Sequence, residues 1–447
     1  MDNLNILHYS FGLPPKATGG LPLYVKDLSE AQKQAGYKIS ILLPKQQLHS
    51  RDIISKKGSI YYLENSLPIA SIFGMKEPKD YMRAYSKTVI EKFLNELKPT
   101  VIHIHSFMGL PKEFLEVAKS KDIKLVYTTH DSYGLCLKCN FIDSTGSTCL
   151  QPNPEKCAKC NLSNGLSTRM SYLIGTDFYK AIKKNKFIHQ LKSKYRDDKM
   201  QEGVITDVSE IDVSTDKINA YANLLKYYDL MFSMIDKFHF NSELTKETYI
   251  AYLPNIKGKV IPITLSSIQD HRNERNRTPG EILTIGYIGR KEPYKGIDLL
   301  IDALTKLHKE NINFECLLYG DDFSKYDLLL NGKVKNMGIY ENRQIKSVFD
   351  TMDLLVIPSI WKETFGFVGL EALSYGVPVL MSENVGCKDL LINKDCIFKS
   401  NVFDLFNKLI TIVNNKNLLS YDSQITTNNL FSIQYHVKKI NKSIYDM

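Results

Sequence analysis

The chain has 447 residues, which at roughly 150 residues per domain leaves room for two or three globular domains. Apolar residues make up 43% of the chain and charged residues 24%, a balance that excludes a mainly disordered or fibrous protein. The net charge of +9 is too small to indicate nucleic-acid binding by itself, and no apolar run approaches the roughly 20 residues that a membrane-spanning helix needs.

The first segment reads as a strand, a glycine-containing loop and a helix. Ile6–Tyr9 is the strand, and the loop ends with Gly19 and Gly20. The helix that follows places apolar residues at helical spacing and stops at Gly36. Because the first ten residues have no basic start and no long apolar region, we expect no secretory signal and a cytoplasmic protein.

Strands alternate with helices in both halves of the chain, which predicts parallel sheets covered on both faces. The predicted fold class is α/β, with two Rossmann-like doubly wound parallel-sheet domains that face a cleft. In such sheets ligands bind outside the carboxyl ends of the strands. The later predicted strands are Ile39–Leu43, Val101–His105, Lys124–Thr129, Leu283–Ile288, Phe314–Tyr319, Asp353–Ile357 and Pro378–Met381.

A polar segment that ends in Pro-Gly separates the two halves. We expect an N-terminal domain over 1–270, with a Cys-rich and helical insertion at about 134–216, and a linker at 271–281. A C-terminal domain would cover 282–429, and a last helix at 430–447 can pack on either domain.

Two glutamates form the most informative motif, Glu363-Thr-Phe-Gly-Phe-Val-Gly-Leu-Glu371. The motif follows a predicted strand, and a helix begins near Phe365–Gly366. A helix start offers free N–H groups and the positive end of the helix dipole, which suit a phosphate. Glu371 can accept hydrogen bonds from sugar hydroxyls. The alternative is an ordinary loop with a solvated carboxylate.

Two cations follow the first strand of the second half. Arg290 and Lys295 can hold a diphosphate, the first through its planar fork and the second as a point charge. Taken alone, they are also compatible with a solvated loop.

Together these motifs resemble glycosyltransferase family 4, which consists of retaining enzymes with the GT-B fold. The resemblance rests on Arg290-x4-Lys295-Gly296 and Glu363-x7-Glu371, and extends to Thr18-Gly19-Gly20, His130-Asp131, Tyr319-Gly320-Asp321 and the stretch 371–379. It covers most of the chain except roughly Cys136–Asp216. The chain departs from the family at Gly386-Cys387, where two glycines are frequent.

The resemblance implies a role for each of these residues. Arg290 and Lys295 would neutralise a nucleoside diphosphate as it leaves, so that the chemistry would require no cofactor. Glu363 would hold hydroxyls of the donor sugar, and His130 would lie beside that sugar near the acceptor. Donor binding would involve Gly19, Gly20, Gly320, Phe365, Gly366 and Glu371, with 338–340 near the base.

Five of the eight cysteines form a cluster that contains two C-x2-C pairs. This spacing predicts a structural zinc held by four of the five thiolates. Buried free thiols, an iron–sulfur cluster and a redox pair are the alternatives. The cluster consists of Cys136, Cys139, Cys149, Cys157 and Cys160.

The segment Tyr179–Lys199 carries eight basic residues beside an approximate apolar stripe. A basic amphipathic helix can lie on an anionic membrane surface, and a solvated helix is the alternative. We expect peripheral contact with the inner face of the cytoplasmic membrane through this segment.

The sequence thus predicts a retaining glycosyltransferase that uses a nucleotide-sugar donor. The acceptor would be a glycan or a polyprenyl-linked molecule, and the product a bacterial surface polysaccharide such as a capsule. No nucleic acid is expected as a partner. The alternatives are a GT-B-fold nucleotide-sugar epimerase and a zinc-dependent nucleic-acid-binding protein.

Overall fold

The structure is a computed structural model that describes residues 4–46, 51–143, 145–149, 152–176, 212–275, 277, 280–416, 425 and 428–446. The chain divides into two compact units. The first comprises Met1–Phe240, Thr248–Ile261 and Val437–Met447, and the second comprises Asn241–Glu247 and Pro262–His436. The predicted linker at 271–281 falls in the second unit. The basic segment Tyr179–Lys199 lies outside the described residues.

The first unit is built on an eight-stranded sheet in the order β3-β4-β2-β1-β5-β6-β7-β8. Neighbouring strands are parallel except in the β3–β4 hairpin, which the sequence does not predict because β3 is polar and largely exposed. The strands are β1 (Asn5–Tyr9), β2 (Lys38–Lys45), β3 (Ile53–Lys57), β4 (Ile60–Glu64), β5 (Val101–Ile104), β6 (Lys124–Thr128), β7 (Lys237–Phe240) and β8 (Gly258–Val260).

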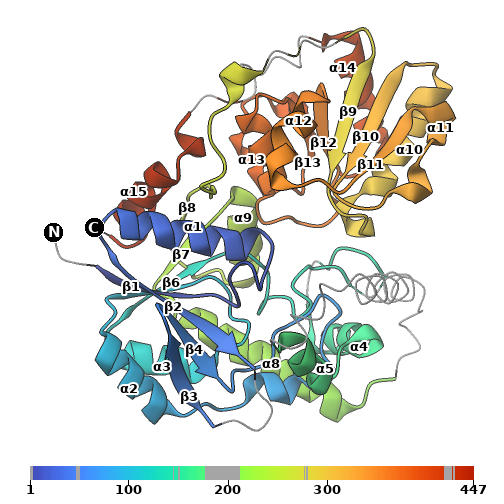
Figure 1. The fold of residues 1–447 in the computed structure, drawn as a ribbon. Helices are drawn as coiled ribbons and strands as arrows, with labels where there is room; N and C mark the ends of the chain where they lie inside the picture. The colour runs from blue at the N-terminus through green and yellow to red at the C-terminus, as the bar shows by residue number, and fades with distance from the viewer. Residues whose placement is uncertain are drawn as a thin grey trace. The chain divides into compact units, whose positions relative to one another are not determined.

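The two faces of this sheet bury different residues, because side chains alternate along each strand. Leu7 and Tyr9 of β1 pack into a large core that also contains residues of α2 (Lys87–Leu97), α3 (Lys112–Ser120) and α8 (Thr215–Ser233). Ile6 packs on the opposite side against the end of α15 (Ile433–Ser443). In Figure 1 this second face is covered by α15 and α1 (Gly20–Gln34).

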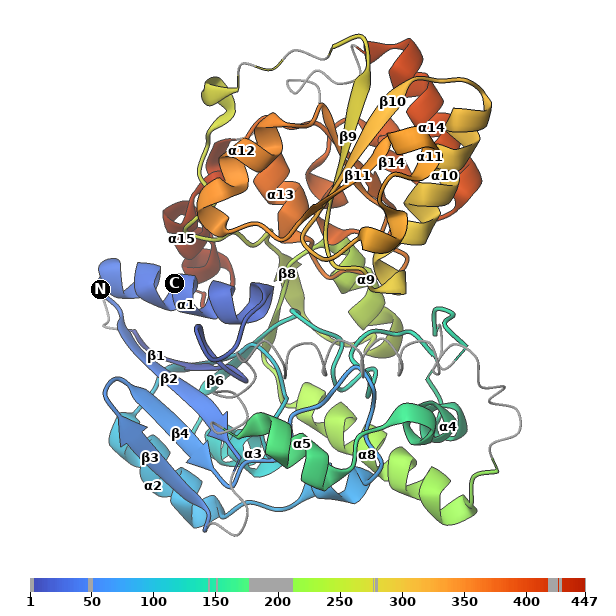
Figure 2. The same ribbon diagram turned by 45° about the vertical axis from the view of Figure 1, so that its right-hand side comes forward.

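The second unit contains a parallel six-stranded sheet in the order β11-β10-β9-β12-β13-β14. In Figure 2 the helices α12 (Ile345–Asp350) and α13 (Phe367–Ser374) lie on one side of it, and α10 (Ile297–Lys309) and α14 (Val402–Asn414) lie on the other. The strands are β9 (Leu283–Ile288), β10 (Phe314–Tyr319), β11 (Val334–Gly338), β12 (Leu354–Ile357), β13 (Val379–Ser382) and β14 (Ile397–Phe398).

Both halves are therefore parallel-sheet α/β domains, as predicted, and each predicted strand coincides with an observed one. The apolar stripe of α10 is buried along its whole length. None of the described helices has both the length and the apolar character required to span a bilayer. The remaining α-helices of the described residues are α4 (Pro154–Asn164), α5 (Thr168–Gly175), α9 (Glu243–Tyr252) and the short α11 (Leu329–Gly332).

Candidate active site

Lys295 and Glu363 form an ion pair in the second unit. The Lys295 Nζ atom lies 2.7 Å from Glu363 Oε1, and the two side chains are 26% and 12% exposed. The Ser359 hydroxyl donates to the same carboxylate oxygen, and the Lys295 ammonium lies 4.9 Å from the ring centre of Trp361. Burial acts to raise the pKa of Glu363, but Lys295 and the Ser359 hydrogen bond outweigh burial and hold the pKa below its ordinary value. The carboxylate of Glu363 is therefore ionised at neutral pH, and it fixes the position of the Lys295 side chain.

The parallel arrangement of β9 and β12 explains why these two residues meet. The strands are neighbours, and Lys295 and Glu363 follow their carboxyl ends at the same edge of the sheet. Gly296 completes the approach with a φ of 78°, a conformation that glycine adopts readily. A Cβ atom at this position would lie 1.8 Å from the Pro358 carbonyl oxygen. Glycine is thus required for the Lys295 loop to pack against the end of β12.

Arg290 lies in the same loop, but its side chain is 64% exposed. Its nearest acid is Glu292, at 3.8 Å between Nη1 and Oε1. The Tyr287 hydroxyl donates to the Arg290 carbonyl oxygen at 2.8 Å and so fixes the backbone. The guanidinium is a cation presented to solvent on an ordered loop.

Three glycines bring backbone segments together at the carboxyl ends of β9, β10 and β11. The Gly289 N–H donates to the Tyr319 carbonyl at 3.0 Å, and the Gly320 N–H donates to the Gly338 carbonyl at 2.9 Å. Gly320 has a φ of 104°, and a Cβ there would lie 2.6 Å from the Gly289 oxygen. Gly320 therefore lies at this edge of the sheet, where only a residue without a side chain fits.

Helix α13 begins at the predicted position. Gly366 caps it with a φ of 92°, and a Cβ there would lie 2.9 Å from Val385 Cγ1 and 3.3 Å from Glu363 Oε2. The preceding Phe365 is buried. The helix start and the carboxylate of Glu363 are thus in direct proximity.

The segment that departs from the family packs against this motif through its backbone. The Gly386 N–H donates to the Glu363 carbonyl at 3.1 Å, and the Cys387 N–H donates to the Phe365 carbonyl at 2.6 Å. A Cβ on Gly386 would lie 2.2 Å from the Thr364 oxygen. The single remaining glycine therefore occupies the position at which the backbones approach most closely.

Glu371 lies in the second turn of α13 and is mostly buried. Within the described parts of the chain, its carboxylate makes no hydrogen bond and no ion pair. Burial raises the pKa of this carboxyl to about 7. The pKa of the Tyr340 hydroxyl is raised to about 12 by burial and then by the charge of Glu371, which places the phenol close to the carboxylate. A polyol ligand can supply the hydrogen bonds that this carboxylate does not receive from the protein.

In the first unit, Gly19 and Gly20 lie where β1 is connected to α1. Gly20 is the first residue of α1, and Gly19 before it has a φ of 120°. A Cβ atom on Gly19 would have no other atom within 4 Å, so the positive φ, rather than crowding, requires glycine. The first turn of the helix carries no acidic side chain, so its N–H groups present a positive end to an anion.

His130 lies just after β6 and is partly exposed. Its Nε2 atom is 3.2 Å from Nδ1 of the buried His105, and its ring centre is 4.7 Å from that of Tyr24. The neighbouring Asp131 accepts a hydrogen bond from the Tyr133 N–H at 2.9 Å and so caps a turn. Burial raises the pKa of Asp131 to about 6.

The five clustered cysteines all lie in the first unit, and none of them forms a disulfide in the described part of the chain. Cys157 and Cys160 lie three residues apart in α4 and are buried. Burial, followed by the sulfurs of Cys136, Cys160 and Cys149, raises the pKa of Cys157. The pKa of Cys139 is raised by burial, then by Asp131 and then by Cys136. The charges of three other clustered sulfurs thus act on Cys157, whereas Asp131 acts on Cys139 ahead of any sulfur.

Sequence reasoning misses several residues that complete these sites. The motifs do not assign Ser359 and Trp361 to Glu363 and Lys295, although both lie in the segment between the strand and the motif. The sequence favours a structural role for His105, and its contact with His130 depends on strand pairing that no local pattern reveals. No pattern in the sequence indicates a role for Tyr445, which lies just after α15.

Two family models match the chain. Residues 268–428 match the family described as glycosyl transferases group 1, and residues 18–144 match glycosyltransferase family 4. An uncharacterized glycosyltransferase of Methanocaldococcus jannaschii is 33% identical over 24% of this chain and 28% of its own length. An uncharacterized 41.2 kDa protein in the cps region of Klebsiella pneumoniae is 29% identical over 31% of this chain and 38% of its own length. The chain thus spans less than half of the length of each of these two relatives.

Solved structures extend the likeness to the whole fold. The structure of Anabaena Alr3699/HepE in complex with UDP superposes with a TM-score of 0.54 at 15% identity, covering 99% of this chain and 100% of that one. A glycosyltransferase from Rickettsia africae ESF-5 gives a TM-score of 0.55 at 15% identity, over 98% and 97% of the two chains. At this level of identity the likeness concerns the fold. The fold is therefore of the GT-B type, and two separate segments of the chain match glycosyltransferase family models.

Proposed function

We propose that this protein is a retaining glycosyltransferase that moves a sugar from a nucleotide-sugar donor to a glycan or lipid-linked acceptor. The observation that carries the proposal is the Glu371 carboxylate, which is mostly buried and makes no hydrogen bond within the described residues. Burying an acceptor without a partner is costly, so such a group is typical of a ligand site. The ribose hydroxyls of a nucleotide are matching donors.

The charges around Lys295 support a role in the departure of a nucleoside diphosphate. Negative charge grows on the diphosphate as the glycosidic bond breaks, and fixed cations stabilise that charge without reorganising. Lys295 is held by Glu363 and Trp361, and Arg290 lies in the same loop. The N-terminus of α13 adds the positive end of a helix dipole. Glu363 can hold sugar hydroxyls through the oxygen that faces Gly366.

His130 and the Gly19–Gly20 helix start are the elements of the first unit that we assign to the donor. The glycine N–H groups suit a phosphate, and the partly exposed imidazole suits a sugar hydroxyl. Gly320 and the neighbouring Gly338–Tyr340 stretch are assigned to the base, because Tyr340 lies near Glu371. In these assignments protein groups take the place of a metal ion.

A role in surface polysaccharide biosynthesis is supported by one relative, which is named for its location in a cps region. The UDP found in one similar structure supports a uridine nucleotide as the first donor to test.

The test is a screen of nucleotide sugars for thermal stabilisation and for slow donor hydrolysis. A bound donor stabilises the fold by mass action. We expect one nucleotide class to raise the melting temperature and its sugar to be released or transferred with the anomeric configuration retained. Epimerisation of the sugar with an intact nucleotide bond would contradict a transferase. An inverted product would contradict retention.

We also propose that Cys136, Cys149, Cys157 and Cys160 hold a structural zinc. Helix α4 places two of these thiols, Cys157 and Cys160, on one face. The loop that carries Cys149 is closed by a hydrogen bond from the Cys149 N–H to the Phe141 carbonyl at 2.7 Å. Tyr252 flanks the group: burial, and then Cys149, Cys136 and Cys157, raise its pKa to about 12. A divalent cation would favour the thiolate form that burial opposes.

A further inference from the structure

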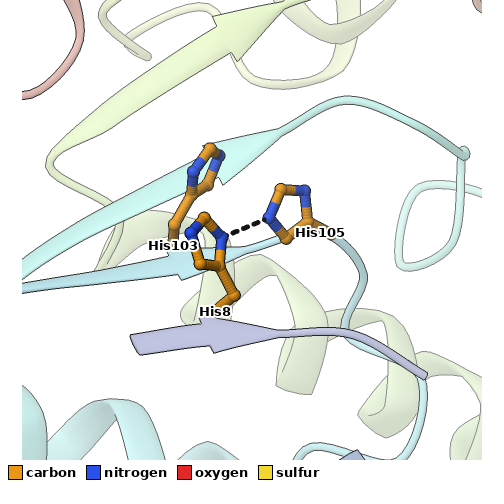
Figure 3. Close-up of side chains that lie close together, drawn as sticks. All are labelled: His8, His103 and His105. Carbon is orange, nitrogen blue, oxygen red and sulfur yellow. Dashed lines mark hydrogen bonds between the residues drawn. The ribbon is translucent and has the colours of Figure 1, made fainter. Parts of the chain in front are cut away.

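A chain of hydrogen bonds runs through the buried face of the first sheet and ends at His130. Its members are contributed by neighbouring strands, where His8 of β1 pairs in register with His103 of β5, and Thr128 of β6 pairs with His239 of β7. Figure 3 shows three of the imidazoles gathered on one side of these strands. The full set is His8, Gln32, His103, His105, Thr128, His130, His239, Ile261 and Tyr445.

The first hydrogen bonds of this series, from the Ile261 carbonyl to His103, determine the direction in which the Tyr445 hydroxyl donates. His239 Nε2 lies 2.8 Å from the Ile261 carbonyl oxygen, which can only accept, so Nε2 carries the proton. Burial lowers the pKa of His239 to about 4, so this ring is neutral and its Nδ1 accepts from Thr128 at 2.9 Å. The Thr128 oxygen then accepts from His103 Nε2 at 2.6 Å.

Complete burial of His103 favours the neutral imidazole, whose Nδ1 accepts from the Tyr445 hydroxyl at 2.8 Å. The Tyr445 oxygen is then left as an acceptor for the Gln32 amide nitrogen at 3.2 Å. This contact orients the amide, so that its oxygen faces His8 Nε2 at 2.7 Å. His8 must therefore carry its proton on Nε2.

The remaining hydrogen bonds of the series, from His8 to His130, determine which ring nitrogen of His130 carries the proton. Burial is the main cause that lowers the pKa of His8 to about 4 and the pKa of His105 well below its ordinary value, so both rings are neutral. His8 Nδ1 accepts from His105 Nε2 at 3.0 Å. His105 Nδ1 in turn accepts from His130 Nε2 at 3.2 Å. His130 thus has its proton on Nε2 and a lone pair on Nδ1.

A metal ion is the other occupant that three close histidines suggest. Candidate ligand atoms of His8, His103 and His105 lie within 4.8 Å of one another. Both ring nitrogens of each of these residues, however, already have a hydrogen-bond partner in this chain. A metal would have to break at least one of these bonds in a fully buried place, so the hydrogen-bonded chain is the interpretation that the distances support.

We propose that Tyr445 and Gln32 are positioning residues that, through His8 and His105, hold His130 as the Nε2–H tautomer. The Nδ1 atom of His130 is then a hydrogen-bond acceptor, which suits a hydroxyl group. That this hydroxyl belongs to a sugar rests on the proposed function, whereas the tautomer itself does not. Tyr445, which follows α15, thereby determines the chemistry of a residue at the edge of the first sheet.

The direct test is a nitrogen NMR spectrum of the full chain labelled with ¹⁵N-histidine, in which protonated and unprotonated ring nitrogens are distinguished. His130→Gln identifies the His130 signals. We expect a protonated Nε2 and an unprotonated Nδ1 at His130 in the wild type. A protonated Nδ1 would overturn the proposal.

Two variants test the positioning. In Gln32→Met the acceptor for His8 Nε2 is lost, so the donor direction can reverse through His105, and His130 should gain the Nδ1–H tautomer. In Tyr445→Phe the Gln32 amide loses its anchor, and both tautomers should appear. The control is Tyr221→Phe, which removes a buried hydroxyl that donates to the Met75 carbonyl at 2.6 Å in the same unit, outside the chain of hydrogen bonds.

Activity supplies an independent readout. In both variants kcat should fall about 10- to 100-fold, by analogy with the range seen when a partner that orients a metal-ligating histidine is lost, while donor affinity is nearly unchanged. Unaltered tautomers in both variants would overturn the proposal. An inactive protein that shows the expected tautomers would leave this inference standing and would contradict the proposed function instead.

Discussion

The ammonium of Lys295 and the carboxylate of Glu363 lie 2.7 Å apart, although the two residues are 68 positions apart in the chain. A donor diphosphate that binds Lys295 would share this ammonium with Glu363. The carboxylate, together with the ring of Trp361, then holds the cation in place before the substrate arrives. The pair is therefore a positioned charge and not merely a stabilising contact.

Removal of this cation should affect turnover more than binding. In Lys295→Ala we expect kcat to fall by roughly 100- to 1,000-fold, because one preorganised group that stabilises developing charge is lost. The Kd of the donor should change much less, since the charge grows only as the bond breaks. The control is Lys325→Ala, which removes a lysine that is 77% exposed in the same unit. Full activity of Lys295→Ala, or a strict requirement for added Mg²⁺, would contradict the metal-free mechanism.

Glu371 should contribute to nucleotide affinity. In Glu371→Ala the affinity for the nucleoside diphosphate should fall by about 1–3 kcal/mol, the range for hydrogen bonds to a charged group. Calorimetry measures this change, with Glu310→Ala, an exposed glutamate after α10, as the control. Unchanged nucleotide affinity in a folded Glu371→Ala protein would remove Glu371 from the donor site.

The raised pKa of Glu371 also makes a prediction for stability without ligand. The folded protein binds this proton more tightly than the unfolded chain, whose carboxyl has the ordinary pKa of 4.5. The free energy of unfolding therefore decreases as the pH rises from about 4.5 to about 7, and the full penalty is present above that range. This penalty amounts to at most about 3.5 kcal/mol, because one pKa unit corresponds to about 1.4 kcal/mol.

The variant Glu371→Gln removes this penalty while keeping the shape of the side chain. We expect it to unfold at a higher denaturant concentration than the wild type at pH 8 and at the same concentration near pH 4.5. Equal midpoints at both pH values would show that the carboxyl is not destabilised by burial. A protein that gains stability and loses nucleotide affinity from one substitution would be typical of a binding residue.

The sequence predicts the layers of this fold because apolar residues recur at the spacing of strands and helices in both halves. Leu283–Ile288 is buried almost throughout, and the stripe of α10 faces the core. Motif spacing likewise places Lys295 and Glu363 each after a strand, whereas the pairing of those two strands is known only from the structure. The β3–β4 hairpin escapes prediction because its first strand is too polar to be distinguished from a loop.

The hydrogen-bonded chain behind His130 could not be predicted for a different reason. Its geometry depends on register, since a shift of one residue between β1 and β5 would turn His8 and His103 to opposite faces. It also needs Tyr445, whose hydroxyl contacts a residue 342 positions earlier in the chain. Neither relation leaves a local pattern in the sequence.

The basic segment Tyr179–Lys199 leads to a prediction about membrane binding that is derived from the sequence alone. Each Lys or Arg near an anionic surface contributes about 1 kcal/mol, and salt screens the attraction within about 8 Å at physiological ionic strength. The protein should sediment with anionic vesicles at low salt and be released at high salt. Replacement of Lys183, Lys184, Lys192 and Lys194 by Glu should reduce sedimentation and leave donor hydrolysis intact. Equal binding to neutral and anionic vesicles would contradict an electrostatic contact.

The cysteine cluster offers a matched pair of substitutions for the proposed zinc site. Burial and then three other clustered sulfurs raise the pKa of Cys157, whereas burial and then Asp131, ahead of Cys136, raise the pKa of Cys139. Elemental analysis of the purified protein should give about one zinc per chain, and Co²⁺ substitution should give the absorption of a tetrahedral thiolate site. We expect Cys157→Ser to lose the metal and Cys139→Ser to retain it.

A chelator should lower the melting temperature without competing with the nucleotide, because the metal stabilises the fold rather than taking part in the chemistry. Metal-free protein with four freely reactive thiols would show that the cluster consists of free thiols and holds no zinc. Loss of zinc only in Cys139→Ser would show that the assignment of the four ligands is wrong.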